Sequence, residues 1–285
     1  MFQKILVPVS SEFYSKDVIK RSIFLAKTFN GIVHLLYIIE EEPFQQMEQR
    51  SDTHRTHYDR TETHHDLVSR HKQTADNIVF EDAQIMFQQN DVPIKHKTIH
   101  GEFSSIVTTE INKHAYDLVV MGYEKGCMID YRLLDELTIP VWIEAGGRHE
   151  SILAVCSNLA PNQKVPNISI QLAEAFDWSL SMLYVIDLQD NVEVDKNGIR
   201  SPKKPKRDLL FAGQNFVNEM NQQHISVKTV EGKLENETIK EAKRLASGLV
   251  IIGREQKKRG TLGLPAKNVK QKMAEKCKYS LLFIN

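Results

Sequence analysis

The segment from Gly253 to Lys272 combines residue types that bind anions. It holds three glycines, Gly253, Gly260 and Gly263, among a run of cations. Glycine lets backbone amides approach a phosphate closely, and lysine and arginine hold an anion by charge. The cations are Arg254, Lys257, Lys258, Arg259, Lys267, Lys270 and Lys272. Two interpretations stay open: a solvated basic loop and helix face, or a site for a phosphate-bearing ligand.

A second concentration of reactive side chains is a group of histidines. It comprises His54, His57, His64, His65 and His71. Three of them are spaced by seven residues, which is about 10.5 Å along a helix axis. Zinc–nitrogen bonds are about 2.1 Å long, so one ion cannot bridge such a gap. Only His54 with His57, or a loop folded back on itself, allows a shared ion, and we predict no metal site.

Motifs for nucleophilic or phosphoryl-transfer catalysis are missing. The sequence has neither Gly-x-Ser-x-Gly nor Gly-x4-Gly-Lys-Ser/Thr. Cys127 shares the first half of the chain with His100 and His114. A single loop cysteine is more often a spectator than a nucleophile, because reactivity requires a lowered thiol pKa. We therefore predict no catalytic residue and no enzyme activity.

Composition and charge exclude several classes of protein. The 37 lysines and arginines balance 37 aspartates and glutamates, which argues against a generally basic nucleic-acid binder. No apolar run approaches the roughly 18 residues of a membrane helix. The three cysteines show no metal or redox spacing, as is typical of reduced thiols in a cytosol. We expect a cytoplasmic protein that neither inserts into membranes nor binds nucleic acid.

The chain also repeats itself. Residues 5–10 and residues 35–40 each recur 147 positions later, so that Ile5 aligns with Ile152. Residues 101–122 recur 131 positions later, which leaves 16 extra residues in the first copy. Matching blocks in the same order indicate two copies of one unit. The expected domains are residues 1–147, with a histidine-rich insertion at about 44–75, and residues 148–285.

Each copy alternates strand and helix signals. Ile5–Val9 is a short apolar run typical of a strand buried on both faces of a parallel sheet. Ser15 suits the N-cap of a helix that continues to about Phe29, and Gly31 stands where a left-handed C′ glycine is common. The pattern predicts an α/β fold of two tandem doubly wound units, each a five-stranded parallel sheet with flanking helices. Ligands of such sheets bind beyond the carboxyl ends of the strands.

One basic run lies inside the second copy. Ser201–Arg207 contains two prolines and four cations and follows a polar stretch from Gln189. Such a composition discourages packing, so we predict a mobile linker. A phosphate or nucleic-acid contact is the alternative.

At this level the chain resembles the universal stress protein family in its tandem form. The resemblance rests on the Ile-Leu-Val-Pro-Val opening and on the Asp-Leu-Val-Val-Met-Gly string at residues 117–122, with Leu249–Gly253 as its second copy. It implies the adenine nucleotide alpha hydrolase-like fold. It also implies pairing of the last strands, so that residues 140–145 lie against residues 281–285 in an internal pseudo-dimer. A homodimer of chains stays open.

The same resemblance implies which residues face a nucleotide. The ATP-binding branch has an aspartate after the first strand, a Gly-x2-Gly after the fourth and a Gly-Ser/Thr farther on. The first copy has Ser10 for the aspartate, and three residues separate Gly122 from Gly126, so we expect no nucleotide there. The second copy keeps a loop of full length. Its candidate residues for ATP or another anion are Ser157, Ile186, Gly253, Arg254, Lys257, Gly260, Gly263, Lys267 and Asn268.

These inferences favour a stress-response protein that acts by binding or regulation and has no turnover of its own. At most one weak nucleotide or anion site, in the second domain, is expected. One alternative is an ATP-binding or ATP-hydrolysing nucleotide sensor, with Asp187 and Glu255 as the available metal-holding carboxylates. Another is a cytosolic regulatory partner of a transporter, with the histidine-rich segment as the partner surface.

Overall fold

The chain forms two compact units. The first is Met1–Leu133 and the second is Leu134–Asn285. The computed structural model describes residues 1–10, 14–39, 78–122, 133–134, 137–147, 149–255, 273–274 and 276–285. The boundary of the units lies before the repeat boundary expected at 147/148. The difference arises because the strand that closes the first repeat is hydrogen-bonded within the second unit.

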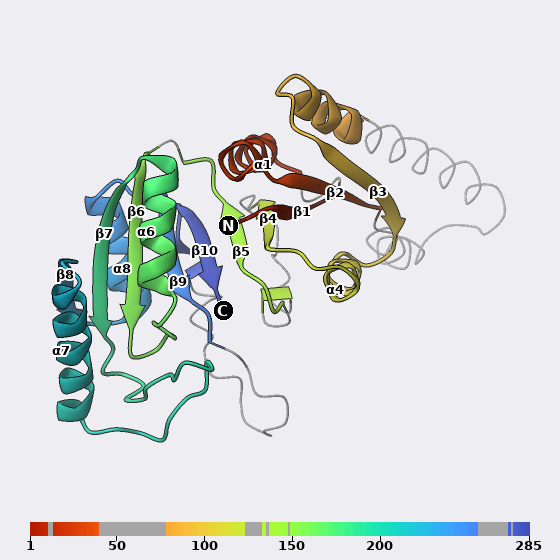
Figure 1. Ribbon diagram of the computed structural model, residues 1–285. Helices are drawn as coiled ribbons and strands as arrows, with labels where there is room; N and C mark the ends of the chain where they lie inside the picture. Colours follow the sequence, from red (N-terminus) through yellow and green to blue (C-terminus); the bar gives the residue numbers. More distant parts are fainter. Residues whose placement is uncertain are drawn as a thin grey trace, which may run out of the picture. The chain divides into compact units, whose positions relative to one another are not determined.

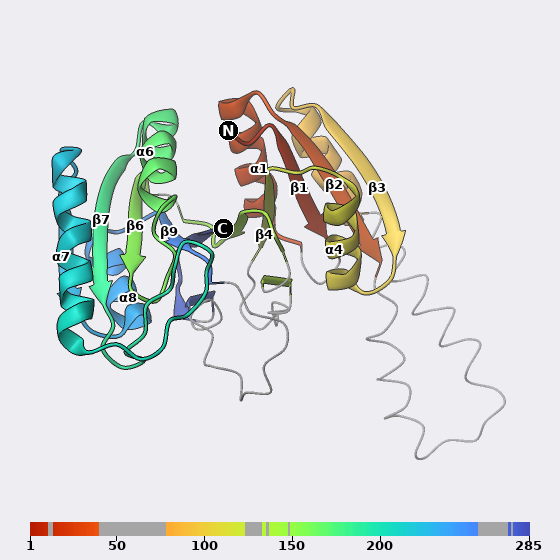
Figure 2. The ribbon, with the colours of Figure 1, turned by 60° about the horizontal axis from the view of Figure 1, so that its bottom comes forward.

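The first unit is a parallel sheet between two layers of helix (Figures 1 and 2). Its described elements are β1 (Lys4–Val9), α1 (Lys16–Phe29), β2 (Ile32–Ile39), the helical residues 78–88, β3 (Ile94–His100), α4 (Phe103–Lys113) and β4 (Leu118–Gly122). The strand order is β3-β2-β1-β4, with parallel pairing. Helix α1 and residues 78–88 cover one face of the sheet, and α4 covers the other (Figure 2).

The second unit repeats this arrangement and extends it. Its described elements are β5 (Val141–Glu144), β6 (Ser151–Ser157), α6 (Val165–Phe176), β7 (Ser179–Ile186), α7 (Lys206–Gln222), β8 (Val227–Glu231), α8 (Leu234–Arg244), β9 (Leu249–Gly253) and β10 (Ser280–Ile284). The strand order is β5-β10-β9-β6-β7-β8. Helices α6 and α7 lie on one face and α8 on the other (Figure 1). The predicted α/β class and strand–helix alternation are confirmed.

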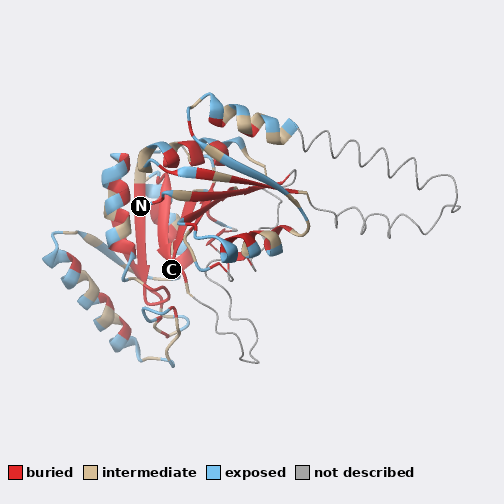
Figure 3. Ribbon diagram, turned by 45° about the vertical axis from the view of Figure 1, so that its right-hand side comes forward, coloured by how far each residue is buried: buried red, intermediate tan, exposed pale blue. Residues whose placement is uncertain are grey.

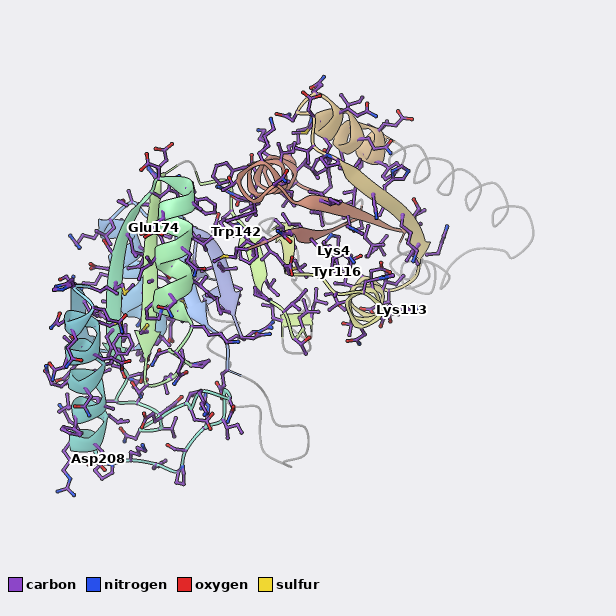
Figure 4. All side chains as sticks on the ribbon, in the orientation of Figure 1. Lys4, Lys113, Tyr116, Trp142, Glu174 and Asp208 are labelled. Carbon is purple, nitrogen blue, oxygen red and sulfur yellow. The ribbon has the colours of Figure 1, made fainter. Side chains whose placement is uncertain are left out.

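Strand β5 comes from the first repeat and pairs antiparallel with β10 of the second. Trp142 stands opposite Leu282 in this pairing. The hydroxyl of Ser280 donates a 3.0 Å hydrogen bond to Oε1 of the buried Glu144. Trp142, labelled in Figure 4, donates its indole N–H to the other oxygen of that carboxylate at 2.9 Å. The strand pairing expected between residues 140–145 and 281–285 is therefore present.

The ends of helix α1 show both a confirmed and a wrong expectation. The side chain of Ser15 caps the helix and accepts a hydrogen bond from the Asp17 amide at 3.3 Å. The left-handed residue at the other end is Asn30, with φ of 49°, and not Gly31. Gly31 is needed for space instead, because a Cβ there would lie 2.7 Å from the carbonyl oxygen of Phe2.

The core of each unit is the sheet itself, as the buried strands in Figure 3 show. In β1, the side chains of Ile5, Leu6 and Val7 are all fully buried. Burial on both faces follows from the two helix layers and accounts for the unbroken apolar runs in the sequence. Within the described ranges, no helix has both the length and the apolar character that crossing a membrane requires.

Candidate functional site

The candidate site lies where the strand order of the second unit reverses. Strand β6 has β7 on one side and β9 on the other, so ligands are expected beyond the carboxyl ends of β6 and β9. Ser157, Ile186 and Gly253 are the last residues of β6, β7 and β9, as the sequence predicted. Arg254 follows directly. The other predicted site residues lie outside the described part of the chain: Lys257, Gly260, Gly263, Lys267 and Asn268.

Ser157 occupies the place of the family's nucleoside-binding aspartate, and it is fully buried. Its hydroxyl accepts a 3.1 Å hydrogen bond from the Leu159 amide. Its backbone N–H and C=O bond the side-chain amide of Asn162 at 2.9 and 3.0 Å. These bonds close the turn after β6, so Ser157 contributes to the local fold and presents no carboxylate to a ligand.

Gly253 is required for packing within the chain. A Cβ at this position would lie 1.8 Å from the carbonyl oxygen of Pro161, in the loop after β6. That distance is a severe overlap, and the obstacle is backbone. The loop after β6 therefore rests directly on the end of β9.

Arg254 was predicted to face an anion, and the structure corrects this prediction. The side chain is buried, with 2% of its surface exposed. Its guanidinium donates to the carbonyl oxygens of Leu134 and Ile139, both at 3.0 Å, and also to that of Leu137. Its Nε donates to Oδ1 of Asn285 at 2.5 Å. Arg254 thus anchors the segment that leads into β5.

Asn158 lies at the predicted strand end but was not among the candidate ligand residues, and it organises the neighbouring strand ends. Its buried side-chain amide donates to the carbonyl oxygens of Asp187 and Val192 at 3.0 and 2.7 Å. Its Oδ1 accepts from the Asp187 amide at 2.7 Å. The Asn158 carbonyl accepts a further 2.7 Å bond from the amide of Val194. Asn158, the first residue after β6, therefore holds the chain that follows β7 by hydrogen bonds.

That chain, residues 187–205, is held by hydrogen bonds. The mobile linker predicted at Ser201–Arg207 is wrong, because the amides of Ser201 and Lys204 donate to the carbonyls of Glu193 and Asn191 at 2.8 and 2.6 Å and α7 begins at Lys206. A bridge between Val194 and Arg200 closes a small hairpin around the turn at Asp195. The Asp195 carboxylate accepts bonds from the amides of Asn197 and Ile199 at 2.9 and 2.8 Å. Figure 1 shows this segment running across the carboxyl ends of β6 and β7. The lysines and prolines of Ser201–Arg207 suggested a linker. The contacts that hold the segment could not be inferred from this composition, because the partner residues are distant in sequence.

Arg200 joins the 187–205 segment to the end of β9. Its guanidinium makes a two-point contact with the Glu255 carboxylate, at 2.5 Å from Nε and 3.0 Å from a terminal nitrogen. Both side chains are largely buried, and the hydrogen bonds to Glu255 raise the pKa of Arg200. Glu255 was one of two carboxylates available for a metal-bound nucleotide. Its two oxygens are instead engaged by an arginine of the same chain.

Asp187, the other carboxylate, serves as a helix cap. Its two oxygens accept 2.9 Å bonds from the amides of Leu234 and Gln189. Helix α8 begins at Leu234, and its N-cap residue, Lys233, makes no side-chain capping bond. A helix N-terminus attracts anions because its first amides lack partners. Here an internal carboxylate takes that role.

The first unit also uses polar side chains internally near the end of β1. The hydroxyl of Tyr14 donates a 2.6 Å bond to Asp82, which also pairs with Lys16 at 3.0 Å. Burial, together with the bond to Asp82, raises the pKa of Tyr14. Ser10 is buried. The first-copy loop from Tyr123 onward, including Cys127, lies outside the described residues.

No metal centre is found among the residues that the structure describes: no three histidine, cysteine or acidic side chains converge as one requires. The histidines from His54 to His71 lie outside that part of the chain. His100 and His114 are described, and His114 lies 3.5 Å from a carboxylate oxygen of Glu110.

Comparison with known proteins agrees with the sequence motifs. The model of the Universal stress protein family matches residues 1–136. No curated protein matches the sequence. Two solved structures share the fold over almost the whole chain. One is a proposed universal stress protein from Pseudomonas aeruginosa UCBPP-PA14, with 12% identity, a TM-score of 0.64 and coverage of 99% of this chain and 93% of that chain.

The other is a universal stress protein from Archaeoglobus fulgidus DSM 4304, with 10% identity and a TM-score of 0.62. The alignment covers 99% of this chain and 98% of that one. Identities this low show a shared fold and carry no residue roles. The sequence match places residues 1–136 in the universal stress protein family, and the chain as a whole shares the fold of these solved universal stress proteins.

Proposed function

We propose that the chain is a cytoplasmic stress-response protein that acts by binding a partner, without nucleotide turnover. The observation that carries the proposal is the 187–205 segment, which Asn158 and Glu255 hold against the strand ends of the second unit. Asn158, Asp187 and Glu255 at that edge bond other groups of the same chain.

The described residues give less support to the alternative, an ATP-hydrolysing sensor. Hydrolysis would require a backbone cradle for phosphate and a carboxylate to hold a metal ion. Asp187 caps α8, Glu255 binds Arg200, and the guanidinium of Arg254 points to backbone carbonyls. Release of these groups would break several buried hydrogen bonds, each of which contributes about 1 kcal/mol.

Isothermal titration of the full chain with Mg-ATP, AMP and inorganic phosphate tests the proposal, together with a phosphate-release assay. We expect no saturable heat and no release of phosphate above the buffer rate. Binding of Mg-ATP at one site per chain, lost in Gly260→Val or Gly263→Val, would contradict the proposal and identify a nucleotide sensor. Sulfate at equal ionic strength serves as the control for weak anion effects.

A further inference from the structure

A groove lies along the outer edge of the second unit's sheet, between α7 and β8. Its volume is about 560 Å³. It is lined by Ile186, Leu210, Phe211, Gln214, Thr229, Val230 and Glu231. The lining residues come from helix α7 and from the ends of β7 and β8, so regular secondary structure forms the walls of the groove. Four of these seven side chains are apolar and three are polar, a mixture found in surfaces that bind peptides.

Phe211 is the most exposed of the large apolar side chains in the described residues, at 68%. Helix α7 packs through a different face, which contains Leu209, Gly213 and Met220. Gly213 permits close approach, because a Cβ there would lie 3.0 Å from the Tyr184 ring. Phe211 lies two positions from both Leu209 and Gly213, about 200° around the helix. It therefore does not contribute to the packing of α7 and faces the groove.

Strand β8 forms the outer edge of this sheet. Among the described strands it is hydrogen-bonded only to β7, and Lys228, Thr229 and Glu231 are exposed. An edge strand offers backbone donors and acceptors to another extended chain. A strand added to β8 would run beneath α7, and its side chains on that face would enter the groove beside Phe211. The groove thus lies where it could accept the side chains of an additional strand.

In the first unit a ring contact occupies the corresponding space between the helical residues 78–88 and β3. There the ring of His96 on β3 contacts the ring of Phe80, with centroids 5.3 Å apart. The His96 ring also lies 3.3 Å from the side-chain amide of Gln84. Val227 occupies the position of His96 in the second repeat, 131 residues later. Valine is smaller than histidine and has no ring to occupy the space between α7 and β8.

Charge distinguishes the two ends of the groove. Lys206 pairs with Glu231 at 3.0 Å, which brings the start of α7 to the carboxyl end of β8. Arg207 is 88% exposed and lies 3.3 Å from Asp208, labelled at the start of α7 in Figure 4. Lys203 is exposed, and no side chain caps this helix. The helix dipole and the excess of cations make this end suited to an acidic residue.

We propose that β8 and the α7 groove bind an extended segment of a partner protein, which adds as a strand to the edge of the sheet. The segment is apolar at alternate positions, so that one face fills the groove beside Phe211. Acidic residues lie at the end next to Lys206 and Arg207. The proposal rests on the proposed function, which it deepens by naming the binding surface and the chemistry of the partner.

Fluorescence anisotropy of the full chain with labelled peptides tests the proposal. The probe is a seven-residue peptide of alternating valine and threonine that begins with two aspartates. One control replaces the aspartates with lysines, and another inserts proline at the central position. We expect saturable binding of the acidic probe, weaker binding of the lysine probe and none of the proline probe. The preference for acid should diminish as salt rises from 50 to 500 mM.

Two variants assign the surface. Phe211→Ser should weaken binding about tenfold through the lost apolar contact, and Arg207→Glu should reverse the preference between the acidic and lysine probes. Ile78→Ser, which changes an exposed isoleucine of the first unit, is the matched control and should bind like the parent. Circular dichroism checks that each variant is folded.

The absence of saturable binding, or equal binding by Phe211→Ser, would overturn the proposal. Self-association that Phe211→Ser abolishes would also overturn it and would assign the edge to a second copy of the chain. The peptide experiment contains no nucleotide, so its failure leaves the titration with Mg-ATP unaffected. The two proposals therefore fail separately.

Discussion

Lys228 and Glu241 form a 2.6 Å ion pair between β8 and α8, and the pair recurs in the first unit as Lys97 and Glu110 at 3.3 Å. Both positions are related by the repeat offset of 131 residues. Each glutamate is buried on the inner face of its helix, while its lysine comes from the edge strand. The duplication is thus visible in a side-chain interaction as well as in the apolar strands. The second unit adds Arg244, which bonds Glu241 at 2.6 Å.

The Glu241 pair should make stability depend on pH. Hydrogen bonds from Arg244 and Lys228 lower the pKa of Glu241 from 4.5 to about 2. The folded state therefore holds the carboxylate charged, and its contribution is full above pH 4.5 and lost as the pH falls toward 2. Glu241→Gln should lower stability at pH 7 by about 1 kcal/mol, or about 2–4 °C in Tm. Thermal unfolding between pH 2 and 7 measures this difference.

The control for this prediction is Glu219→Gln, an exposed position on α7. The difference in Tm between Glu241→Gln and the parent should shrink steadily below pH 4.5, whereas the control should follow the parent throughout. A difference that stays constant down to pH 2 would show that the ionised carboxylate contributes nothing.

The fold was predictable because its signals are local. The apolar run at Ile5–Val9 coincides with β1, apart from one residue at its start. Ser15 was identified as a cap from its residue type alone. Asn30 was missed because asparagine enters the left-handed region less often than glycine, and the adjacent Gly31 carried the stronger signal.

The site was only partly predictable because its determinants are distant in sequence. Ser157, Ile186 and Gly253 were placed at strand ends by topology. The partners of Arg254 are backbone carbonyls, which leave no trace in residue type. Arg200 directly precedes the run interpreted as a linker, and its partner Glu255 is 55 positions away. Long-range contacts of this kind outweigh the local preference of lysine and proline for open chain.

Loss of the contact between Arg200 and Glu255 should loosen the 187–205 segment. Two-point contacts between arginine and carboxylate are among the stronger polar interactions, and a partly buried one contributes about 1–2 kcal/mol. We expect Glu255→Ala to increase the rate of trypsin cleavage after Arg200 about tenfold, because local opening governs such cleavage. Mass spectrometry of the early fragments identifies the bond that is cut.

Glu174→Ala provides the comparison for that experiment, because Glu174 is exposed on α6 (Figure 4). Its digestion pattern should match the parent. Equal cleavage rates in Glu255→Ala and the parent would mean that other contacts hold the segment.

Removal of the Asn158 side chain should have a larger effect. Asn158→Ala leaves the Asp187 amide and the Val192 carbonyl without their buried partner. Unpaired buried groups cost about 1–3 kcal/mol each, so we expect a loss of about 3 kcal/mol in the free energy of unfolding. Urea denaturation followed by circular dichroism measures it. Asn218→Ala, which removes only an exposed bond to Gln214, should change stability by less than about 0.5 kcal/mol.

The strongest expected effect is at Arg254. Replacement of a buried ion pair by apolar residues is often tolerated, but the partners of this guanidinium are neutral carbonyls that stay buried after substitution. Arg254→Met should therefore cost about 3 kcal/mol or more. Arg254→Lys should retain only part of the parent's free energy of unfolding, because an ammonium cannot reach three separated carbonyls. Urea unfolding followed by tryptophan fluorescence, to which Trp142 on the adjoining β5 contributes, reports the loss.

Arg207→Met, at an 88% exposed side chain, is the control for removal of a cation and should leave the unfolding midpoint unchanged. The critical result is the order of stability, in which the parent is most stable, Arg254→Lys is intermediate and Arg254→Met is least stable. If Arg254→Met were as stable as the parent, the guanidinium would not anchor the segment before β5, and Arg254 would again be a candidate anion ligand. If the ranking holds, Arg254 is a structural residue, and the candidate anion ligands that remain from the predicted loop are those after Glu255.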